Sequence, residues 1–549
     1  MKGVLLVIFD GLGIALPGPG NAYFLADPKN LASYYQRYPH TQLKASGESV
    51  GLPADEVGST EVGHLNIGAG RIVYQSLPRI NLSIADGSFF KNDVFVNAIK
   101  HAKANNSKLH IIGLLGGGTV HSSTAHLYAL LFLCQEQKFN NVYLHIITDG
   151  RDSPPKSVEI YLEDLQNKLI QMGIGTIATV MGRYYAMDRD RRWERVEKAY
   201  KCLTEGIGDK AVTAKAAVEA SYEKGLTDEF IMPTSIVNDA SPSPVVVSDN
   251  DAVIFYNFRI DRPRELAKAF VLDSFESDAN KRGFDPYAIH YHSKHQLDDI
   301  EEPPVATPFT RVIKLKNLYF ATMTEYEEGL PVHVAFPPHV VDMPLGRVIS
   351  EAGFQQIRLA ESEKERFVTH YFNGLRNQPF PQEDRLIVPS PKVATYDLRP
   401  EMSARELTQV IIDKLKTETY KFMLVNYANP DMVGHTGNLT AAIKAVQVSD
   451  ECIGKIVEEA LKHDYSVVIT ADHGNVEEML DPKTGGIATE HSGNNVPFIA
   501  ISNELQGKNV TLPVGILADI APTILALLNI AQPPQMTGRN LLEEILQDD

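Results

Sequence analysis

A carboxylate and an imidazole stand side by side in the sequence, as Asp472 and His473, directly after the apolar run 467–469. A short β-branched run of this kind predicts a strand that is covered on both faces. In open α/β sheets, ligands bind outside the carboxyl ends of the strands. The two side chains therefore indicate a metal site, and a turn aspartate beside a surface histidine is the alternative interpretation.

The same arrangement recurs elsewhere in the chain. Asp10 follows the apolar run 4–9, and Asp431 and His435 follow a predicted strand that ends near residue 425. Because Asp431 and His435 are four residues apart, one helical turn would place them on the same face. A structural pair that satisfies itself is the alternative. His491, in a predicted loop, counts only as a member of this set.

Thr60 stands where a helix is predicted to begin. Its hydroxyl could be an N-cap, or it could be a nucleophile at the positive end of the helix. With this residue included, the candidate metal ligands are Asp10, Thr60, Asp431, His435, Asp472, His473 and His491.

The make-up of this set predicts a metal and a class of reaction. Carboxylate and imidazole ligands without thiolate favour Mn²⁺, with Zn²⁺, Co²⁺ or Fe²⁺ as other candidates, and seven residues are enough for two ions. Two ions about 4 Å apart suit in-line phosphoryl transfer, because they stabilise the attacking and leaving oxygens together. A threonine hydroxyl bound to one ion would lose its proton readily and could attack phosphorus.

Arginines follow three further predicted strands. They are Arg151 after the strand 142–147, Arg183 and Arg189 after the strand 177–181, and Arg259 and Arg262 after the strand 253–255. Their placement predicts convergence on an anion, because the guanidinium fork matches the oxygens of a carboxylate or phosphate. A solvated charged surface is the alternative, particularly for Arg191 and Arg192.

Strands and helices alternate along the whole chain, which is typical of an α/β protein. Further strands are predicted at 109–115, 318–323 and 496–501, and helices at 125–134, 404–415, 441–461 and 517–528. Because the opening residues and the late motifs must meet in one site, we expect a discontinuous metal-binding domain, residues 1–75 and 316–549. A second α/β domain, residues 76–315, would be inserted into it and bind the substrate. The stretch 279–308 receives no function.

Composition narrows the class of protein. The chain has 549 residues, enough for more than one domain, and its formal net charge of −17 argues against nucleic acid as a partner. Its three cysteines lack metal-ligand spacing and fit a cytoplasmic protein. We find no apolar segment long enough for a signal peptide or a membrane span.

Several longer motifs resemble the cofactor-independent phosphoglycerate mutase family of the alkaline phosphatase superfamily. The matching segments are 61–71, 149–152, 182–190, 257–262, 389–397, 429–437 and 471–475. The resemblance covers nearly the whole chain. It implies an alkaline-phosphatase-like three-layer domain with a second α/β domain inserted into it, a monomer, and a small phosphoglycerate substrate.

The resemblance also implies an activity and roles for residues. The family interconverts 3-phosphoglycerate and 2-phosphoglycerate through a phosphoenzyme, without 2,3-bisphosphoglycerate. One Mn²⁺ would be held by Asp431, His435 and His491, and the other by Asp10, the nucleophile, Asp472 and His473. The substrate would be bound by His121, Arg151, Asp152, Arg183, Arg189, Arg259, Arg262 and Lys364, with Asp152 as the acid and base for the glycerate hydroxyls.

The chain departs from the family pattern at the nucleophile. The family has Gly-Asn-Ser-Glu where this chain has Gly58-Ser59-Thr60-Glu61, so a threonine with a stiffer side chain stands at the serine position. We predict that Thr60 is the nucleophile, and Ser59 is the alternative. The loop before His121 also differs, with Gly-Gly-Gly-Thr at 116–119 in place of Ser-Asp-Gly-Gly, and Lys364 is followed by Glu-Arg-Phe in place of Tyr-Ala-His.

Other functions remain open at this point. A metal-dependent phosphatase would share the first half of the reaction and then let water attack the phosphothreonine. Phosphopentomutase is a relative with a threonine nucleophile, but the Arg151 and 182–190 motifs fit the glycerate enzyme better. A binding protein that keeps the metals without turnover is the non-enzymatic alternative, and the change at Thr60 is its main support.

Overall fold

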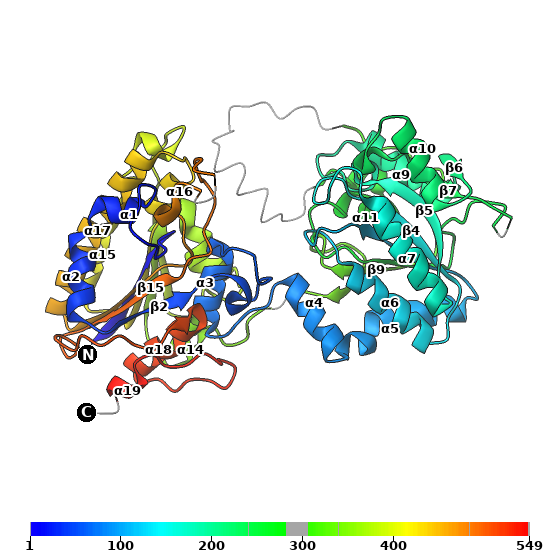
Figure 1. Cartoon of the computed structure of the whole chain (residues 1–549). Helices are drawn as coiled ribbons and strands as arrows, with labels where there is room; N and C mark the ends of the chain where they lie inside the picture. The colour runs from blue at the N-terminus through cyan, green and yellow to red at the C-terminus, as the bar shows by residue number, and fades with distance from the viewer. Residues whose placement is uncertain (1, 240, 282–305, 339, 482–483, 547–549) are drawn as a thin grey trace. The chain divides into compact units, whose positions relative to one another are not determined.

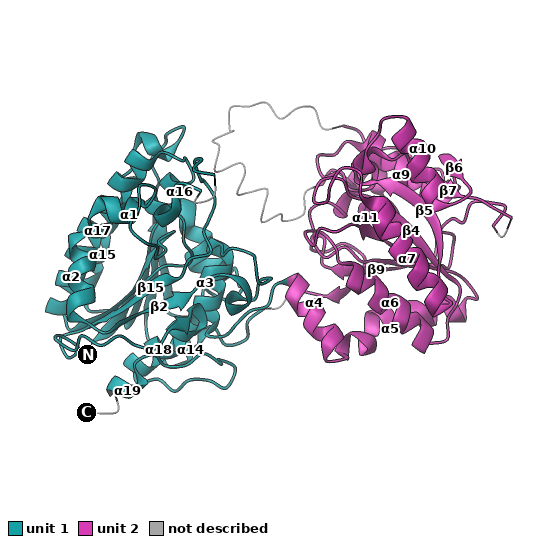
Figure 2. Cartoon of the chain, viewed as in Figure 1, with its two compact units in different colours: residues 1–75, 293–296, 339–549 teal, residues 76–292, 297–338 magenta. Residues whose placement is uncertain are grey.

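The computed structural model describes residues 2–239, 241–281, 306–338, 340–481 and 484–546 (Figure 1). Within these residues the chain forms two compact units (Figure 2). Unit 1 contains residues 2–75 and 340–546, and unit 2 contains residues 76–281 and 306–338. Most of the stretch 279–308 lies outside the described residues.

An eight-stranded sheet forms the centre of unit 1, in the order β12-β11-β13-β1-β14-β15-β2-β16. The strands are β1 Gly3–Phe9, β2 His40–Lys44, β11 Gln356–Glu361, β12 Glu383–Val388, β13 Phe422–Tyr427, β14 Tyr465–Thr470, β15 Val496–Ile501 and β16 Gly515–Ile516. The strands β13, β1 and β14 are parallel neighbours at its middle. Each is buried along its whole length, which explains why their sequences are mostly apolar.

Helices cover both faces of this sheet, so that unit 1 has three layers (Figure 1). On one face lie α1 Ala22–Ala26, α2 Lys29–Arg37, α15 Ala404–Thr417 and α17 Leu439–Lys462, and on the other lie α3 Thr60–Ala69, α14 Leu345–Glu351 and α18 Ile520–Leu527. The helices α16 Asn429–Gly434 and α19 Glu543–Leu546 complete the unit. The N-cap of the long helix α17 is Asn438, whose side chain accepts a hydrogen bond from the Ala441 amide.

Unit 2 is built on a second eight-stranded sheet, in the order β10-β9-β8-β3-β4-β5-β7-β6. Its strands are β3 Leu109–Leu115, β4 Val142–Thr148, β5 Thr176–Gly182, β6 Asp209–Ala211, β7 Thr234–Ile236, β8 Ala252–Phe255, β9 Tyr319–Thr324 and β10 His333–Phe336. The predicted α/β class, with one domain inserted into the other, is confirmed.

The second domain boundary differs from the expected one. We expected the outer domain to resume at residue 316, but β9 pairs in parallel with β8, and β10 pairs with β9. Both strands therefore belong to the sheet of unit 2, and unit 1 resumes after residue 338. The strand pattern around residue 319 indicates a strand without indicating which sheet it joins.

Two apolar cores cover the two faces of the second sheet. Ile111 of β3 belongs to one core, and the next residue, Ile112, belongs to the other, because successive side chains of a strand point to opposite faces. The first core is covered by α5 Asp93–Ala104, α6 Thr124–Glu136 and α7 Val158–Met172, and the second by α8 Arg183–Ala186, α9 Trp193–Glu205, α11 Arg264–Val271 and α12 Phe275–Asp278. The unit also contains α4 Ser76–Ala85 and α10 Ala214–Glu223.

Candidate functional site

The register of three strands brings the predicted metal ligands of unit 1 together. Ile8 of β1 lies opposite Asn426 of β13 and opposite Thr470 of β14. The three strands therefore end at the same edge of the sheet. The segments that follow them carry the aspartates Asp10, Asp431 and Asp472 to this edge, Asp431 within α16.

The first ligand set consists of Asp431, His435 and His491. The Nε2 atoms of His435 and His491 lie 3.3 Å and 3.4 Å from Asp431 Oδ1 and 3.2 Å from each other. The Nδ1 atoms donate to backbone carbonyls, from His435 to Thr489 and from His491 to Gly58. With its hydrogen on Nδ1, the neutral form of an imidazole has a lone pair on Nε2. Two such lone pairs and a carboxylate converge on one point, which is the arrangement that a cation requires.

The second set consists of Asp10, Asp472 and His473, all fully buried. His473 Nε2 lies 3.5 Å from Asp10 Oδ1 and 3.4 Å from Asp472 Oδ2. Asp472 Oδ2 is buried and lies 3.3 Å from His64 Nδ1, but that nitrogen donates to the Thr60 carbonyl at 2.9 Å, which leaves Oδ2 without a hydrogen-bond partner among the described residues. An unsatisfied buried carboxylate oxygen is costly, and a cation bound there would satisfy it.

Burial decides the protonation of two members of the second set. It raises the pKa of Asp10 to about 7, with a further contribution from the charge of Asp472. It lowers the pKa of His473 to about 4, so that this imidazole is neutral at physiological pH. The two ligand sets adjoin each other, because the rings of His473 and His491 stack with centroids 3.7 Å apart. Both sets therefore fit divalent cations in adjacent positions.

Thr60 is the first residue of α3 and points into this site. Its Oγ1 donates to His473 Nε2 at 2.9 Å and accepts from Lys364 Nζ at 3.1 Å. The N-cap of the helix is Ser59, whose side chain accepts from the Val62 amide at 3.4 Å. The N-cap interpretation of Thr60 is therefore wrong, since the neighbouring serine fills that role.

Lys364 lies within unit 1, among the predicted metal ligands. Its ammonium donates to Asp10 Oδ1 at 2.8 Å, to Asp431 Oδ2 at 2.7 Å and to Thr60. Burial opposes its charge, but the carboxylates of Asp10 and Asp431 outweigh burial and hold its pKa above the ordinary value. The ammonium of Lys364 therefore balances the charge of one aspartate from each ligand set.

We predict that Lys364→Met destabilises the metal-free protein by about 3–5 kcal/mol, because it leaves buried carboxylates without a counter-charge. Mn²⁺ should then raise the melting temperature of the variant by more than that of the wild type. Urea unfolding and thermal melting, each with and without Mn²⁺, measure the two effects. Lys462→Met, at an exposed position of α17, is the control. Equal Mn²⁺-induced shifts in wild type and Lys364→Met would contradict this account.

Glu361, at the end of β11, helps to position the short helix that carries Lys364, η5 Ser362–Lys364. Its Oε1 accepts from the Ser403 amide at 3.0 Å, and its Oε2 is buried without a hydrogen-bond partner among the described residues. Burial raises the pKa of this carboxyl from 4.5 to about 8. The folded protein therefore holds one more proton than the unfolded chain between these two pH values.

The pH dependence of stability follows from this extra proton. The stability that this proton adds is complete below pH 4.5 and is lost as the pH rises to about 8. Over this range the free energy of unfolding falls by about 1.4 kcal/mol per pH unit. Glu361→Gln removes this slope. The free energy of unfolding of the variant, relative to the wild type, should therefore rise by about 2–3 kcal/mol between pH 5.5 and 7.5. Urea unfolding at the two pH values measures the difference, and a constant difference would refute the assignment.

Several residues that sequence reasoning did not select hold the ligands in place. Asn426 Nδ2 donates to Asp10 Oδ2 at 2.6 Å and lies 3.1 Å from His64 Nε2. Asn475 Nδ2 donates to Asp431 Oδ1 at 2.9 Å. These residues lie within or beside the motifs, but a side-chain amide in a motif does not indicate which carboxylate it will contact.

The predicted arginines of unit 2 come together at the carboxyl ends of its strands. Arg183 NH1 donates to Asp149 at 2.6 Å and to Asp152 at 2.5 Å, and its NH2 lies 3.0 Å from His121 Nε2. Burial and the Arg183 charge lower the pKa of His121 to about 4. The histidine is therefore neutral and can accept a hydrogen bond.

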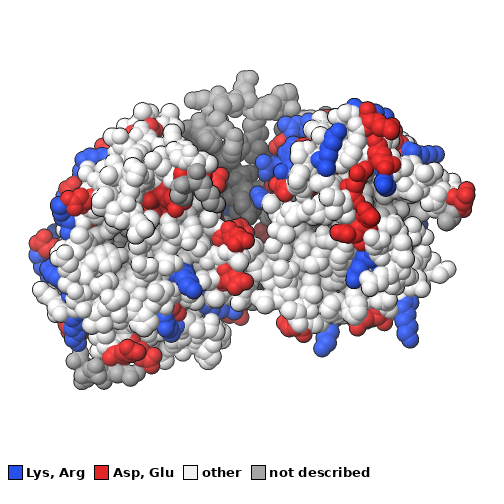
Figure 3. All heavy atoms as spheres, in the orientation of Figure 1, with Lys and Arg blue, Asp and Glu red and all other residues white. Residues whose placement is uncertain are grey.

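A pocket of about 120 Å³ opens beside Arg183, and neither His121 nor Asp152 is among the side chains that line it. Its arginines are Arg151, Arg183, Arg189, Arg192, Arg195 and Arg262. Asp261 accepts from Arg189 at 2.8 Å and lies 3.3 Å from Arg259, and Glu229 accepts from Arg151 at 2.7 Å. Sequence reasoning missed Arg195 and left Arg192 as surface charge. The carboxylates of Asp188, Asp190 and Glu229 also line the pocket, so its six arginines exceed its three carboxylates. On the face in view in Figure 3, charges of both signs are interspersed over unit 2.

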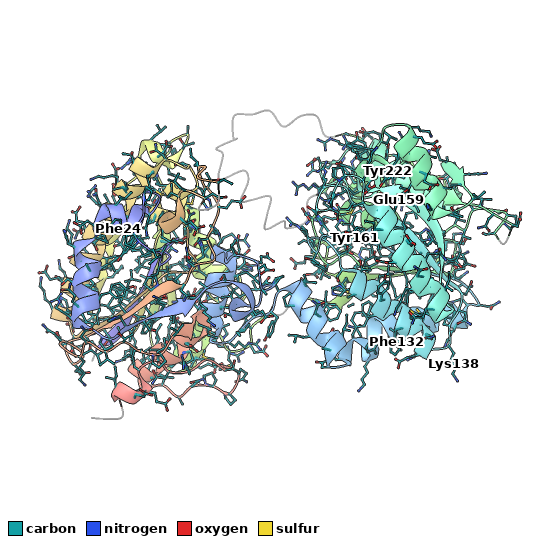
Figure 4. All side chains as sticks on the ribbon, in the orientation of Figure 1. Phe24, Phe132, Lys138, Glu159, Tyr161 and Tyr222 are labelled. Carbon is teal, nitrogen blue, oxygen red and sulfur yellow. The ribbon has the colours of Figure 1, made fainter. Side chains whose placement is uncertain are left out.

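The glycines before His121 pack tightly against neighbouring segments of unit 2. A Cβ on Gly117 would lie 2.1 Å from the hydroxyl of Tyr161, which projects from α7 (Figure 4), and a Cβ on Gly118 would lie 2.6 Å from the Asp152 carbonyl. The amides of both glycines donate to Ser153 Oγ. The loop that differs from the family pattern is thus held against the segment that carries Asp152.

Two sequence families match this chain. Residues 80–328 match the family described as BPG-independent PGAM N-terminus, and residues 343–530 match the sulfatase family. These ranges correspond to unit 2 and to most of the second segment of unit 1. Within the described residues, no helix combines the length and apolar character needed to cross a membrane.

Similar proteins extend over the whole chain. The 2,3-bisphosphoglycerate-independent phosphoglycerate mutase of Chloroflexus aurantiacus is 49% identical over 541 residues, covering 98% of each chain. That of Moorella thermoacetica is 47% identical over 539 residues, again covering 98% of each. A crystal structure of Leishmania mexicana phosphoglycerate mutase at low cobalt concentration is 27% identical, covers 98% of this chain and 97% of that one, and superposes with a TM-score of 0.58.

Proposed function

Since the chain belongs to the family of 2,3-bisphosphoglycerate-independent phosphoglycerate mutases, we propose that it interconverts 3-phosphoglycerate and 2-phosphoglycerate through a phosphoryl group carried on Thr60. The enzyme is an isomerase of this family. The observation that supports Thr60 most directly is its position. Its Oγ1 lies beside His473 and Lys364, where both ligand sets adjoin.

Two divalent cations are part of the proposal. Asp431, His435 and His491 would hold one, and Asp10, Thr60, Asp472 and His473 would hold the other. The donor set favours Mn²⁺, and the unsatisfied Asp472 Oδ2 and the converging imidazole lone pairs support cation binding. When bound, such ions would polarise the phosphoryl oxygens and favour the alkoxide of Thr60.

Protein side chains would carry out the attack on phosphorus, the charge balance and the proton transfers. In its alkoxide form, Thr60 Oγ1 would form a bond to phosphorus as the bond from phosphorus to the substrate oxygen breaks, and it would leave again as the alkoxide in the second transfer. The ammonium of Lys364 would balance charge that spreads over the phosphoryl oxygens. Asp152 would give a proton to the glycerate oxygen that leaves. It would later take one from the other hydroxyl as that oxygen attacks the phosphothreonine. The contact from Arg183 keeps the Asp152 carboxylate oriented.

Retention of glycerate separates a mutase from a phosphatase. After the first transfer, glycerate must stay bound while its other hydroxyl replaces the first, whereas a phosphatase releases the alcohol and admits water. The arginine pocket of unit 2 supports retention, because its guanidinium groups match the glycerate carboxylate.

The proposal is tested by supplying 3-phosphoglycerate and Mn²⁺ without 2,3-bisphosphoglycerate and following two products. We expect 2-phosphoglycerate to form much faster than free phosphate. Faster phosphate release would indicate a phosphatase, and the absence of both products would indicate a binding protein.

We further predict that Arg183→Gln lowers kcat/KM by roughly 10²–10³-fold and raises the ratio of free phosphate to 2-phosphoglycerate. The variant loses the contacts that orient Asp152 and line the pocket. Arg183→Lys should also be impaired, because an ammonium cannot replace the fork of the guanidinium. Arg347→Gln, at an exposed pair on α14, is the control. Normal product partition in Arg183→Gln would contradict a role in retention.

A further inference from the structure

Glu477 is a buried carboxylate at the centre of the loops that carry the ligands. It lies in η8 Val476–Glu478 and is 3% exposed. Its Oε2 accepts from the amides of Gly13 at 2.8 Å and Asn475 at 2.9 Å. Its Oε1 accepts from Ser492 Oγ and from Asn494 Nδ2, the latter at 3.0 Å.

These four contacts occupy the carboxylate completely. Each oxygen accepts two hydrogen bonds, which is the usual capacity of an ionised carboxylate. Both oxygens are therefore directed at protein donors, and neither has a lone pair left to coordinate an ion. Glu477 acts on the ligand loops and not on a metal directly.

The four donors come from three ligand-bearing loops, because Ser492 and Asn494 lie on the same one. Gly13 lies three residues after Asp10, Asn475 lies two residues after His473, and Ser492 follows His491 directly. Through its side chain, Asn475 also contacts Asp431. One carboxylate thus connects the loops of both ligand sets.

The backbone has been brought unusually close to this carboxylate. A Cβ on Gly13 would lie 2.3 Å from Glu477 Oε1, and a Cβ on Gly474 would lie 2.4 Å from the same atom. Only glycine leaves room for Glu477 at these two positions. The loops are therefore fitted around the carboxylate, and a change in its hydrogen bonding would be transmitted to the adjacent ligands.

We propose that Glu477 is a positioning residue that sets the spacing of the ligand loops and so determines the affinity of both metal sites together. The proposal rests on the two-cation function above. It adds a residue outside the ligand sets, through which the two sites are coupled.

Glu477→Gln tests the proposal with little change of shape. Whichever way the amide turns, its NH₂ group faces two groups that donate to the carboxylate in the wild type. We expect the dissociation constants for Mn²⁺ at both sites to rise by about 10- to 100-fold. Titration of the metal-free protein, followed by calorimetry and by the electron paramagnetic resonance signal of free Mn²⁺, measures them.

The adjacent Glu478 provides the matched control. Glu478→Gln makes the same change of charge one residue away, and Glu478 shares only the contact to Asn494, at 3.2 Å. Its Mn²⁺ affinities should equal those of the wild type. Ser492→Ala removes one of the four contacts and should weaken both sites by a smaller factor. This variant keeps the test valid if Glu477→Gln does not fold.

Turnover at saturating Mn²⁺ separates positioning from catalysis. A positioning role predicts that excess Mn²⁺ restores kcat of Glu477→Gln to near the wild-type value. Unchanged affinities in both Glu477→Gln and Ser492→Ala, or weakening of one site alone, would overturn the inference. A wild-type protein that binds no Mn²⁺ would instead overturn the proposed function on which it rests.

Discussion

Replacing Thr60 with alanine should lower phosphoglycerate mutase activity by roughly 10⁴- to 10⁶-fold, the effect typical of removing a nucleophile. The expected cause is the loss of the oxygen that lies between His473 Nε2 and Lys364 Nζ. Thr60→Ser should stay within about tenfold of the wild type, because it keeps that oxygen and removes only the methyl group. Steady-state assays with 3-phosphoglycerate measure the rates. Mass spectrometry of acid-quenched enzyme locates the phosphoryl group.

Ser59→Ala is the matched control for this prediction. Ser59 is the N-cap of the same helix, so its loss should cost about 1 kcal/mol of stability and leave kcat nearly unchanged. A phosphopeptide carrying its phosphate on Ser59, or a Thr60→Ala enzyme that keeps its activity, would reject Thr60 as the nucleophile.

The strand ends were the part of the site that could be predicted from sequence. The apolar runs before Asp10 and Asp472 predict buried strands. Because β1 and β14 are parallel neighbours, the residues that follow these two strands lie at the same edge of the sheet. The closeness of Asp431 and His435 could be predicted from their spacing of four residues, which one helical turn places on the same face. The division of the ligands into two sets followed from the family resemblance, and metal binding by these sets stays a prediction.

The contacts that hold this site together could not be predicted in the same way. Glu477 contacts Gly13 across 464 residues of sequence, and Asn426 contacts Asp10 across 416. Such contacts depend on the packing of whole elements, and no periodicity of the sequence specifies them. The predicted domain boundary at residue 316 was wrong for a related reason. The sequence of β9 indicates a strand, but only its pairing with β8 assigns that strand to the sheet of unit 2.

Removing divalent ions should abolish turnover reversibly. Each ion would contribute several kcal/mol of transition-state stabilisation, so complete stripping with a chelator should lower kcat by at least about 10³-fold. Added Mn²⁺ should restore activity as occupancy approaches two ions per chain. Elemental analysis after dialysis and parallel assays measure occupancy and rate. An enzyme that turns over after complete stripping would reject the two-ion mechanism.

Variants of the two ligand sets distinguish one ion from two. His435→Ala removes a ligand from the first set and Asp472→Asn removes one from the second, so each variant should bind about one ion per chain at Mn²⁺ concentrations that saturate the wild type. His463→Ala, which lies outside both sets, should keep two. Because the sets adjoin through His473 and His491, a single shared ion is the competing arrangement. It predicts a wild-type occupancy of one, lost entirely in either variant.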